Sequence, residues 1–311
     1  MWETSIFGFT LYQLFWYFVL YSLLGWCAEV VFCTVNTGKF VNRGFLNGPV
    51  CPIYGFGMLI VLCALTPLSG SLPVLFVGGA VLASLLELVT GFALEKLFHT
   101  QWWDYSDKPF NVGGYICLSF SLLWGLLIVL VMRVIHPVVA GAVAVVPTLA
   151  GEIAAVPVLL AYLADLAVTV RGILKFNRSL GELEKIAQAL HKVSQGLSET
   201  LGEKSLEAAA AVGEKGQALG ERLEETKANL SGLLDGTRAS LDEKRLQAAL
   251  GAAEYRDELQ RRLDELQARY NELMAARPSR ISRRLMRAFP DMKLRRGGEI
   301  LDELRERLKR K

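Results

Sequence analysis

The chain has 311 residues, of which 52% are hydrophobic, and its mean hydropathy is +0.32. Residues 1–175 contain only seven of its 34 lysines and arginines. This composition excludes a uniformly soluble protein and predicts a membrane part that is followed by a polar part.

The net charge of +3 is unevenly distributed. Residues 1–175 carry 7 basic and 8 acidic groups, residues 176–276 carry 14 and 18, and residues 277–311 carry 13 and 5, so the three net charges are −1, −4 and +8. We therefore expect an all-α protein in three parts. These are a transmembrane domain (1–175), a cytoplasmic coiled-coil arm (176–276) and a basic amphipathic tail (277–311).

Apolar stretches predict a bundle of five membrane spans, because a spanning helix needs about 20 mainly apolar residues. The five stretches are residues 9–32, 50–65, 72–98, 113–135 and 148–170. The second stretch is short for a span, and Pro157 is expected to kink the fifth. Residues 138–146 are expected to form an outer loop or a half-helix.

Basic residues indicate how the bundle is oriented. Those near the spans gather on one side, after the first, third and fifth spans: Lys39, Arg43, Lys96, Lys108, Arg171, Lys175 and Arg178. Only Arg133 falls on the other side. By the positive-inside rule, the N-terminus lies outside and the C-terminus lies in the cytoplasm of a multi-pass cell-membrane protein.

The polar part is expected to be helical. Leucines and other apolar residues recur at steps of three and four from Leu183 and again from Leu259, a spacing that is typical of coiled coils. "SGLLDGT" (231–237) is the expected turn of an antiparallel hairpin, and the arm is a candidate for self-association. A loosely helical, solvated arm without a fixed partner is the alternative.

The tail combines arginines with apolar residues such as Leu285, Met286 and Phe289. This pattern suits an amphipathic segment on anionic lipid. It equally suits a tail that folds back onto the cytoplasmic loops. Nucleic acid is not an expected partner, because no aromatic residues are interleaved with the basic ones for base stacking.

Acidic residues within the spans are candidate site residues, because each costs about 2.5–3.5 kcal/mol at the membrane centre. They are Glu29, Glu87, Glu95 and Asp165. Arg43, in "NRGFLNGPVCPIYG" (42–55), is their expected partner, since a guanidinium satisfies carboxylates well at low dielectric. The pair either locks helices together or lines a substrate cavity.

A second polar passage, "HTQWWDYSDKPFN" (99–111), lies on the same side as Arg43. Its aromatic residues Trp102, Trp103 and Tyr105 are natural interfacial anchors. Asp104, Asp107 and Asn111, together with His99, offer ligands for a cation or an amine headgroup.

"NRGFLNGPVCPIYG", "WDYSDKPFNVGGYICL" and "RLMRAFPDMK" (284–293) resemble the bacterial membrane-protein family labelled putative ABC-transporter permeases, type IV. The resemblance covers about residues 9–175 and the tail, and it implies a permease component whose substrate and catalytic residues are not assigned. The positions that carry the motifs are Asn42, Arg43, Gly44, Gly48, Pro49, Tyr54, Gly55, Trp103, Asp104, Tyr105 and Asn111.

No GxxxxGK[ST] phosphate loop, HExxH or GxSxG occurs in the sequence. We therefore expect no enzymatic activity, no catalytic residues, no cofactor and no bound metal. A separate ATPase subunit or an ion gradient would have to supply energy.

Three functions are consistent with these patterns. The first is a transport component with a polar site at the cytoplasmic side of the bundle, its path lined by Glu87 and Glu95. The second is a membrane-anchored scaffold whose arm and tail recruit partners or anionic lipid. The third is an intramembrane enzyme that acts on lipid, with Asp104, His99 or Glu87 as acid or base.

Overall fold

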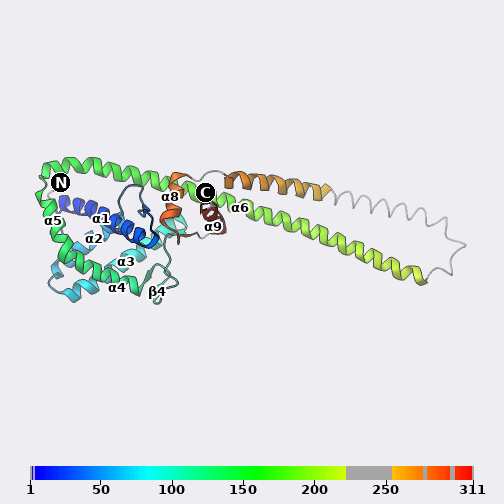
Figure 1. Cartoon of the computed structure of the whole chain (residues 1–311), viewed down its shortest axis with the longest axis horizontal. Helices are drawn as coiled ribbons and strands as arrows, with labels where there is room; N and C mark the ends of the chain where they lie inside the picture. Colours follow the sequence, from blue (N-terminus) through cyan, green and yellow to red (C-terminus); the bar gives the residue numbers. More distant parts are fainter. Residues whose placement is uncertain (1, 3, 222–253, 276–278, 295–297, 310–311) are drawn as a thin grey trace. The chain divides into compact units, whose positions relative to one another are not determined.

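A computed structural model of the chain describes residues 2, 4–221, 254–275, 279–294 and 298–309, and these are mostly helical (Figure 1). The chain divides into two units. The membrane unit contains Met1–Leu180 and Arg277–Lys311, and the second unit contains Gly181–Ala276.

The membrane unit is built from apolar helices joined by short segments. Their order is α1 (Leu11–Thr37), α2 (Pro52–Leu65), the 3₁₀ turn η1 (Thr66–Leu68), α3 (Leu72–Phe98), α4 (Leu118–Leu130), the π-helical turn η2 (Val131–Ile135), α5 (His136–Val145) and α6 (Thr148–Glu221). Four of the described helical segments are long and apolar enough to cross a membrane: Leu11–Thr37, Leu72–Phe98, Leu118–Val145 and Thr148–Gln195.

The predicted span at 72–98 coincides with α3. Residues 138–146, expected as an outer loop or half-helix, lie almost wholly in the ten-residue helix α5, which follows α4 through η2 and lies at an angle to it (Figure 1). Pro137 is tolerated near the start of α5 because the wider π turn before it relieves the clash between the proline ring and the preceding carbonyls.

The second predicted span is the short helix α2, and the loop before it explains why it is short. The Cys51 N–H donates to the Ser22 carbonyl at 2.9 Å, so α2 begins beside the middle of α1 rather than beside its end at Thr37. At 1.5 Å per residue, the loop has turned back by about 22 Å. With 14 residues, α2 is shorter than a spanning helix needs. The five-span count therefore remains a prediction.

Three two-stranded ribbons, all antiparallel, complete the described residues of the membrane unit. β1 (Ser5–Ile6) pairs with β2 (Phe9–Thr10) before α1, and β4 (Asn111–Val112) pairs with β5 (Ile116–Cys117). β3 (Thr100–Gln101) pairs with β6 (Lys293–Leu294), which joins the segment after α3 to the C-terminal tail. The tail also contains α8 (Arg280–Ala288) and α9 (Gly298–Lys309).

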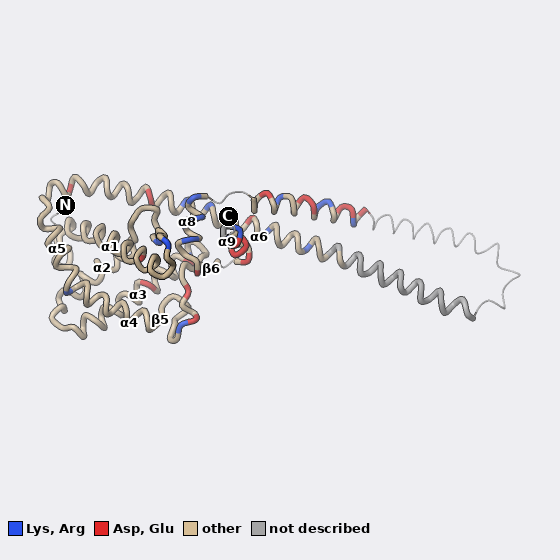
Figure 2. The backbone as a smooth tube through the Cα atoms, in the orientation of Figure 1, with Lys and Arg blue, Asp and Glu red and all other residues tan. Residues whose placement is uncertain are grey.

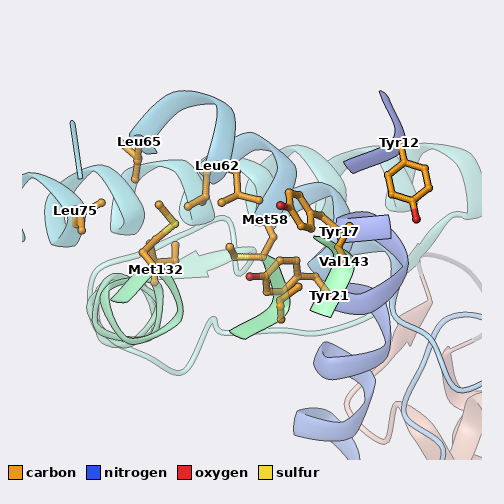
Figure 3. Close-up of a cluster of buried hydrophobic side chains, with 12 residues drawn as sticks. Tyr12, Tyr17, Tyr21, Met58, Leu62, Leu65, Leu75, Met132 and Val143 are labelled. Carbon is orange, nitrogen blue, oxygen red and sulfur yellow. The ribbon is translucent and has the colours of Figure 1, made fainter. Parts of the chain in front are cut away.

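The core lies between α1, α2, α3 and the α4–α5 segment (Figure 3). Tyr17 and Tyr21 of α1 face Met58 and Leu62 of α2, and the Tyr21 hydroxyl lies 3.0 Å from Nδ1 of His136. The outer surface is apolar as well: every fourth residue of α3 from Val77 to Val89 is more than half exposed. An apolar exterior over a packed interior suits helices that are surrounded by lipid.

The second unit contains the rest of α6 and a helix at 254–275. The latter helix carries exposed ion pairs between residues one turn apart, such as Arg262 with Glu258 at 3.1 Å. The predicted turn at 231–237 lies outside the described residues, and the coiled-coil arm remains a prediction.

Close packing of α1 on α2 depends on two glycines. A Cβ at Gly25 would lie 2.3 Å from Tyr54, and a Cβ at Gly55 would lie 2.4 Å from Ser22 Oγ. Neither helix has room for a side chain at these positions, so the glycines set the distance between the two helices.

We expect Gly55→Ala to lower the free energy of unfolding by about 1–3 kcal/mol, because the added methyl group overpacks this contact. Gly141→Ala is the matched control, since a Cβ there meets nothing within 4 Å. Thermal unfolding of the detergent-solubilised protein compares the two. Equal stability of both variants would contradict the packing described here.

Candidate functional site

Residues 39–51 form the re-entrant loop, which turns back from the end of α1 into the bundle. Gly38, with φ 69°, ends α1 in the left-handed conformation and redirects the chain. Asn42 then fixes the first turn: its Oδ1 accepts from Trp26 Nε1 at 2.8 Å, and its Nδ2 donates to the Asn47 carbonyl at 2.8 Å. Leu46 is buried at the centre of the loop.

Asp165 of α6 binds the loop from its N–H side. Its carboxylate accepts from the backbone N–H of Asn47 at 3.1 Å, from Asn47 Nδ2 at 2.8 Å and from the backbone N–H of Gly48 at 2.7 Å. A Cβ at Gly48 would lie 3.3 Å from Asp165 Oδ2, so glycine permits this close approach. The Thr169 hydroxyl also donates to the carboxylate at 3.2 Å.

Arg284 of α8 binds the same loop from its carbonyl side. Its two terminal nitrogens donate to the carbonyls of Gly44 at 2.6 Å and Phe45 at 2.8 Å. Burial lowers the pKa of Arg284, and the nearby charge of Asp165 opposes that shift. Backbone without regular structure can lie within a membrane bundle only where protein satisfies its polar groups. Asp165 and Arg284 do this for the re-entrant loop from opposite sides.

Arg43 projects from the loop toward α1. Its Nε lies 3.6 Å from Glu29 Oε2, and both side chains are about one quarter exposed. The Tyr54 hydroxyl of α2 donates to the other Glu29 oxygen at 2.5 Å. Glu29 therefore ties the re-entrant loop to the first two helices.

The segment between α3 and α4 (residues 99–117), here called the second loop, holds the two acids of α3. The Tyr105 hydroxyl donates to Glu87 Oε1 at 3.1 Å, and the Tyr115 hydroxyl donates to Glu95 Oε2. The second oxygen of Glu87, Oε2, is buried without a hydrogen bond of good geometry, although the indole of Trp124 lies nearby.

The second loop is also joined to the tail. Lys293 donates to Asp104 Oδ2 at 2.5 Å beside the β3–β6 ribbon. The Trp102 ring packs against Phe289 of the tail at 5.0 Å and against Phe45 of the re-entrant loop at 5.5 Å. Three passages that are far apart in the sequence therefore meet at one end of the membrane unit, here called the loop end.

The predicted acids have different hydrogen-bonding and ion-pair partners. Arg43 meets Glu29, whereas Asp165 meets loop backbone and amide, and Glu87 and Glu95 meet tyrosines. The predicted cation ligands are also engaged: Asp104 binds Lys293 and Ser106, and Asn111 donates to the carbonyls of Ser106 and Lys108. No cluster of three or more His, Cys, Asp or Glu side chains suited to a metal occurs among the described residues.

Several residues that hold the site together were not singled out from the sequence. Asn47 lies inside the first motif, and Tyr115, Arg284 and Lys293 lie inside the other two. Their membership in the motif segments was the available signal. Their partners were not predictable, since Arg284 lies 240 residues from Gly44.

These observations define a multi-pass membrane protein whose spans are closed at one end by interlocked polar loops. Residues 16–170 match the family described as "Putative ABC-transporter type IV", and the chain belongs to this family over that range. No curated protein and no solved structure matches the chain.

Asp165→Asn should lower the free energy of unfolding by at least about 1.5–3 kcal/mol, the size of one hydrogen bond to a charged group. The variant loses the negative charge of the carboxylate, and the NH₂ group of its new amide faces one of the N–H donors of the loop. Asp107→Asn, at an exposed position of the second loop, is the control. Thermal unfolding in detergent is the measurement. A melting temperature equal to that of the control would show that Asp165 does not hold the loop.

The stability of the contact between the second loop and the tail should depend on pH. Hydrogen bonds from Lys293 and Ser106 hold the pKa of Asp104 at about 2, below its ordinary 3.8. A depressed pKa adds stability that is present above the ordinary value and is lost as the pH falls from about 4 toward 2. Asp104 raises the pKa of Lys293, so the contribution of Lys293 is lost only at strongly alkaline pH.

Acidification from pH 5 to about 2 should therefore lower the protection factors of the amides in β3 and β6, that is, their protection relative to an unfolded chain at the same pH, before it lowers those in α3. Lys293→Gln should show faster exchange already at pH 5, whereas Lys108→Gln should behave like the parent chain. Protection factors in β3 and β6 that do not change between pH 5 and pH 2 in the parent chain would contradict the ion pair.

Proposed function

We propose that this chain is the membrane component of a transport system, with its polar path at the loop end of the bundle. The observation that carries the proposal is Glu87, an acidic side chain within α3 whose Oε2 is buried without a well-formed hydrogen bond. Ionisable groups within spans are expensive, and they commonly mark ion or substrate pathways. Family membership over residues 16–170 supports the same class.

Glu87 does not stand alone on this path. The Tyr54 ring, whose hydroxyl is bound to Glu29, lies 5.9 Å from the ring of Trp124, and Trp124 neighbours Glu87. Arg43, Glu29, Tyr54 and Glu87 thus form a polar line between the re-entrant loop and α3. In the transport step that we propose, a proton, a cation or a polar substrate moves along this line by replacing these contacts one after another.

The loop end is proposed to face the cytoplasm of a cell membrane. Within the membrane unit, basic residues gather on the loops and on α8 (Figure 2). Arg133, in the π turn η2, instead donates to the carbonyl of Ser69, which lies between η1 and α3, at 2.6 Å. This asymmetry supports an outside N-terminus and a cytoplasmic C-terminus.

The same contacts favour transport over scaffolding. A tail that recruits partners should be free, but α8 is bound to the re-entrant loop through Arg284, and the tail is bound to the second loop through Lys293. A separate ATPase subunit that acts on the loop end would therefore move the loop, the tail and the polar line together.

The test compares cells that lack the chain with cells that carry variants of it, using the small-molecule content of cells and medium as the readout. We expect Glu87→Gln to fail to restore the parental profile although the protein reaches normal membrane levels. A chain that lacks residues 181–276 should restore the parental profile. Glu152→Gln, a carboxyl in α6 that lies outside the polar line, is the matched control.

The opposite pattern, in which Glu87→Gln restores the profile and the deletion does not, would favour the scaffold. A Glu87→Gln chain that is absent from the membrane would assign the polar line to folding rather than to transport.

A further inference from the structure

A pocket of about 250 Å³ opens between the start of the re-entrant loop and α8. It lies entirely within the membrane unit, and it is separate from the polar line of Glu29 and Glu87. Four of its seven lining residues are arginines, and none is acidic: Phe40, Val41, Asn42, Arg280, Arg283, Arg284 and Arg287.

The sequence of α8 places these arginines together. Positions 280, 283, 284 and 287 follow the i, i+3, i+4, i+7 pattern of one helix face. Leu285, Met286 and Ala288 are buried on the remaining surface, which fixes the orientation of the helix. Ser279 caps its first turn by accepting from the Ser282 N–H at 3.1 Å.

The four arginines differ in what they already bind. Arg284 holds the re-entrant loop through its two terminal nitrogens. Among the described residues, the side chains of Arg280, Arg283 and Arg287 make no ion pair or hydrogen bond, and Nε of Arg283 is buried without a partner. Like charges held together in this way repel one another unless an anion lies between them. Forked guanidinium donors match phosphate oxygens well.

We propose that this pocket binds a phosphate group. The surroundings favour a phospholipid headgroup as its source. Phe40 at the rim is 70% exposed, and the adjoining last turns of α1 carry Phe32 and Val35, which are 56% and 78% exposed. These side chains form an apolar surface along which acyl chains can lie while the headgroup phosphate enters the pocket.

The test uses the full chain in a neutral detergent, titrated with phosphatidylglycerol and with phosphatidylcholine, and native mass spectrometry counts the bound lipid. A second arm titrates inorganic phosphate and follows the thermal unfolding temperature. The pocket variant is Arg280→Gln with Arg287→Gln, because both side chains are exposed and without partners. Arg256→Gln with Arg307→Gln removes the same charge from exposed positions elsewhere.

We expect the pocket variant to bind phosphatidylglycerol about tenfold more weakly or worse, and the control pair to bind as the parent chain does. Arg283→Gln alone should also weaken binding, which gives a second test if the double variant folds poorly.

The two arms separate the sources of phosphate. Lipid binding that is lost in the pocket variant and that inorganic phosphate does not displace identifies a headgroup. Inorganic phosphate binding that is lost in the variant, without any preference for phosphatidylglycerol, identifies a free phosphate compound instead. Equal binding of both ligands by the pocket variant and the control variant would overturn the proposal.

Discussion

The carboxylate of Asp165 is the group on which the loop end of the membrane unit depends. A chain that turns back beside the middle of α1 exposes N–H and C=O groups where little water is available, and each unpaired group would cost free energy. Asp165 satisfies the N–H groups of Asn47 and Gly48, and Arg284 satisfies the carbonyls of Gly44 and Phe45. With both in place, α2 can start halfway along α1 and place Tyr54 against Glu29.

This arrangement makes the C-terminal tail part of the membrane unit. Arg284 and Lys293 are about 190 to 240 residues away from their partners, yet they hold the two loops that contact the acids of α1 and α3. A force applied to α8 or to β6 would therefore be transmitted to the polar line through hydrogen bonds rather than through a flexible linker. Such a linkage is what a transport component needs if a separate subunit drives it.

The sequence predicted the membrane class, α3 and the family from local signals, because the length of an apolar stretch and the residues of a motif are properties of short segments. It could not predict which acid meets which partner. Arg43 was expected to meet one or more carboxylates, and among the described residues its ion pair is with Glu29. Asp165 was expected to meet Arg43, yet it binds the side chains of Asn47 and Thr169 and the loop backbone, and backbone partners have no sequence signature. Residues 138–146 were expected as an outer loop or a half-helix, and they lie almost wholly in α5, which follows the π turn η2.

Hydrogen–deuterium exchange of the re-entrant loop tests the central claim most directly. The amides of Asn47, Gly48 and Cys51 each donate a hydrogen bond within the bundle. We expect these three amides to exchange as slowly as those of α1 and α3, although they lie in a loop rich in glycine and proline. Exchange as fast as that of the exposed residue Asp107 would show that the loop lies outside the bundle.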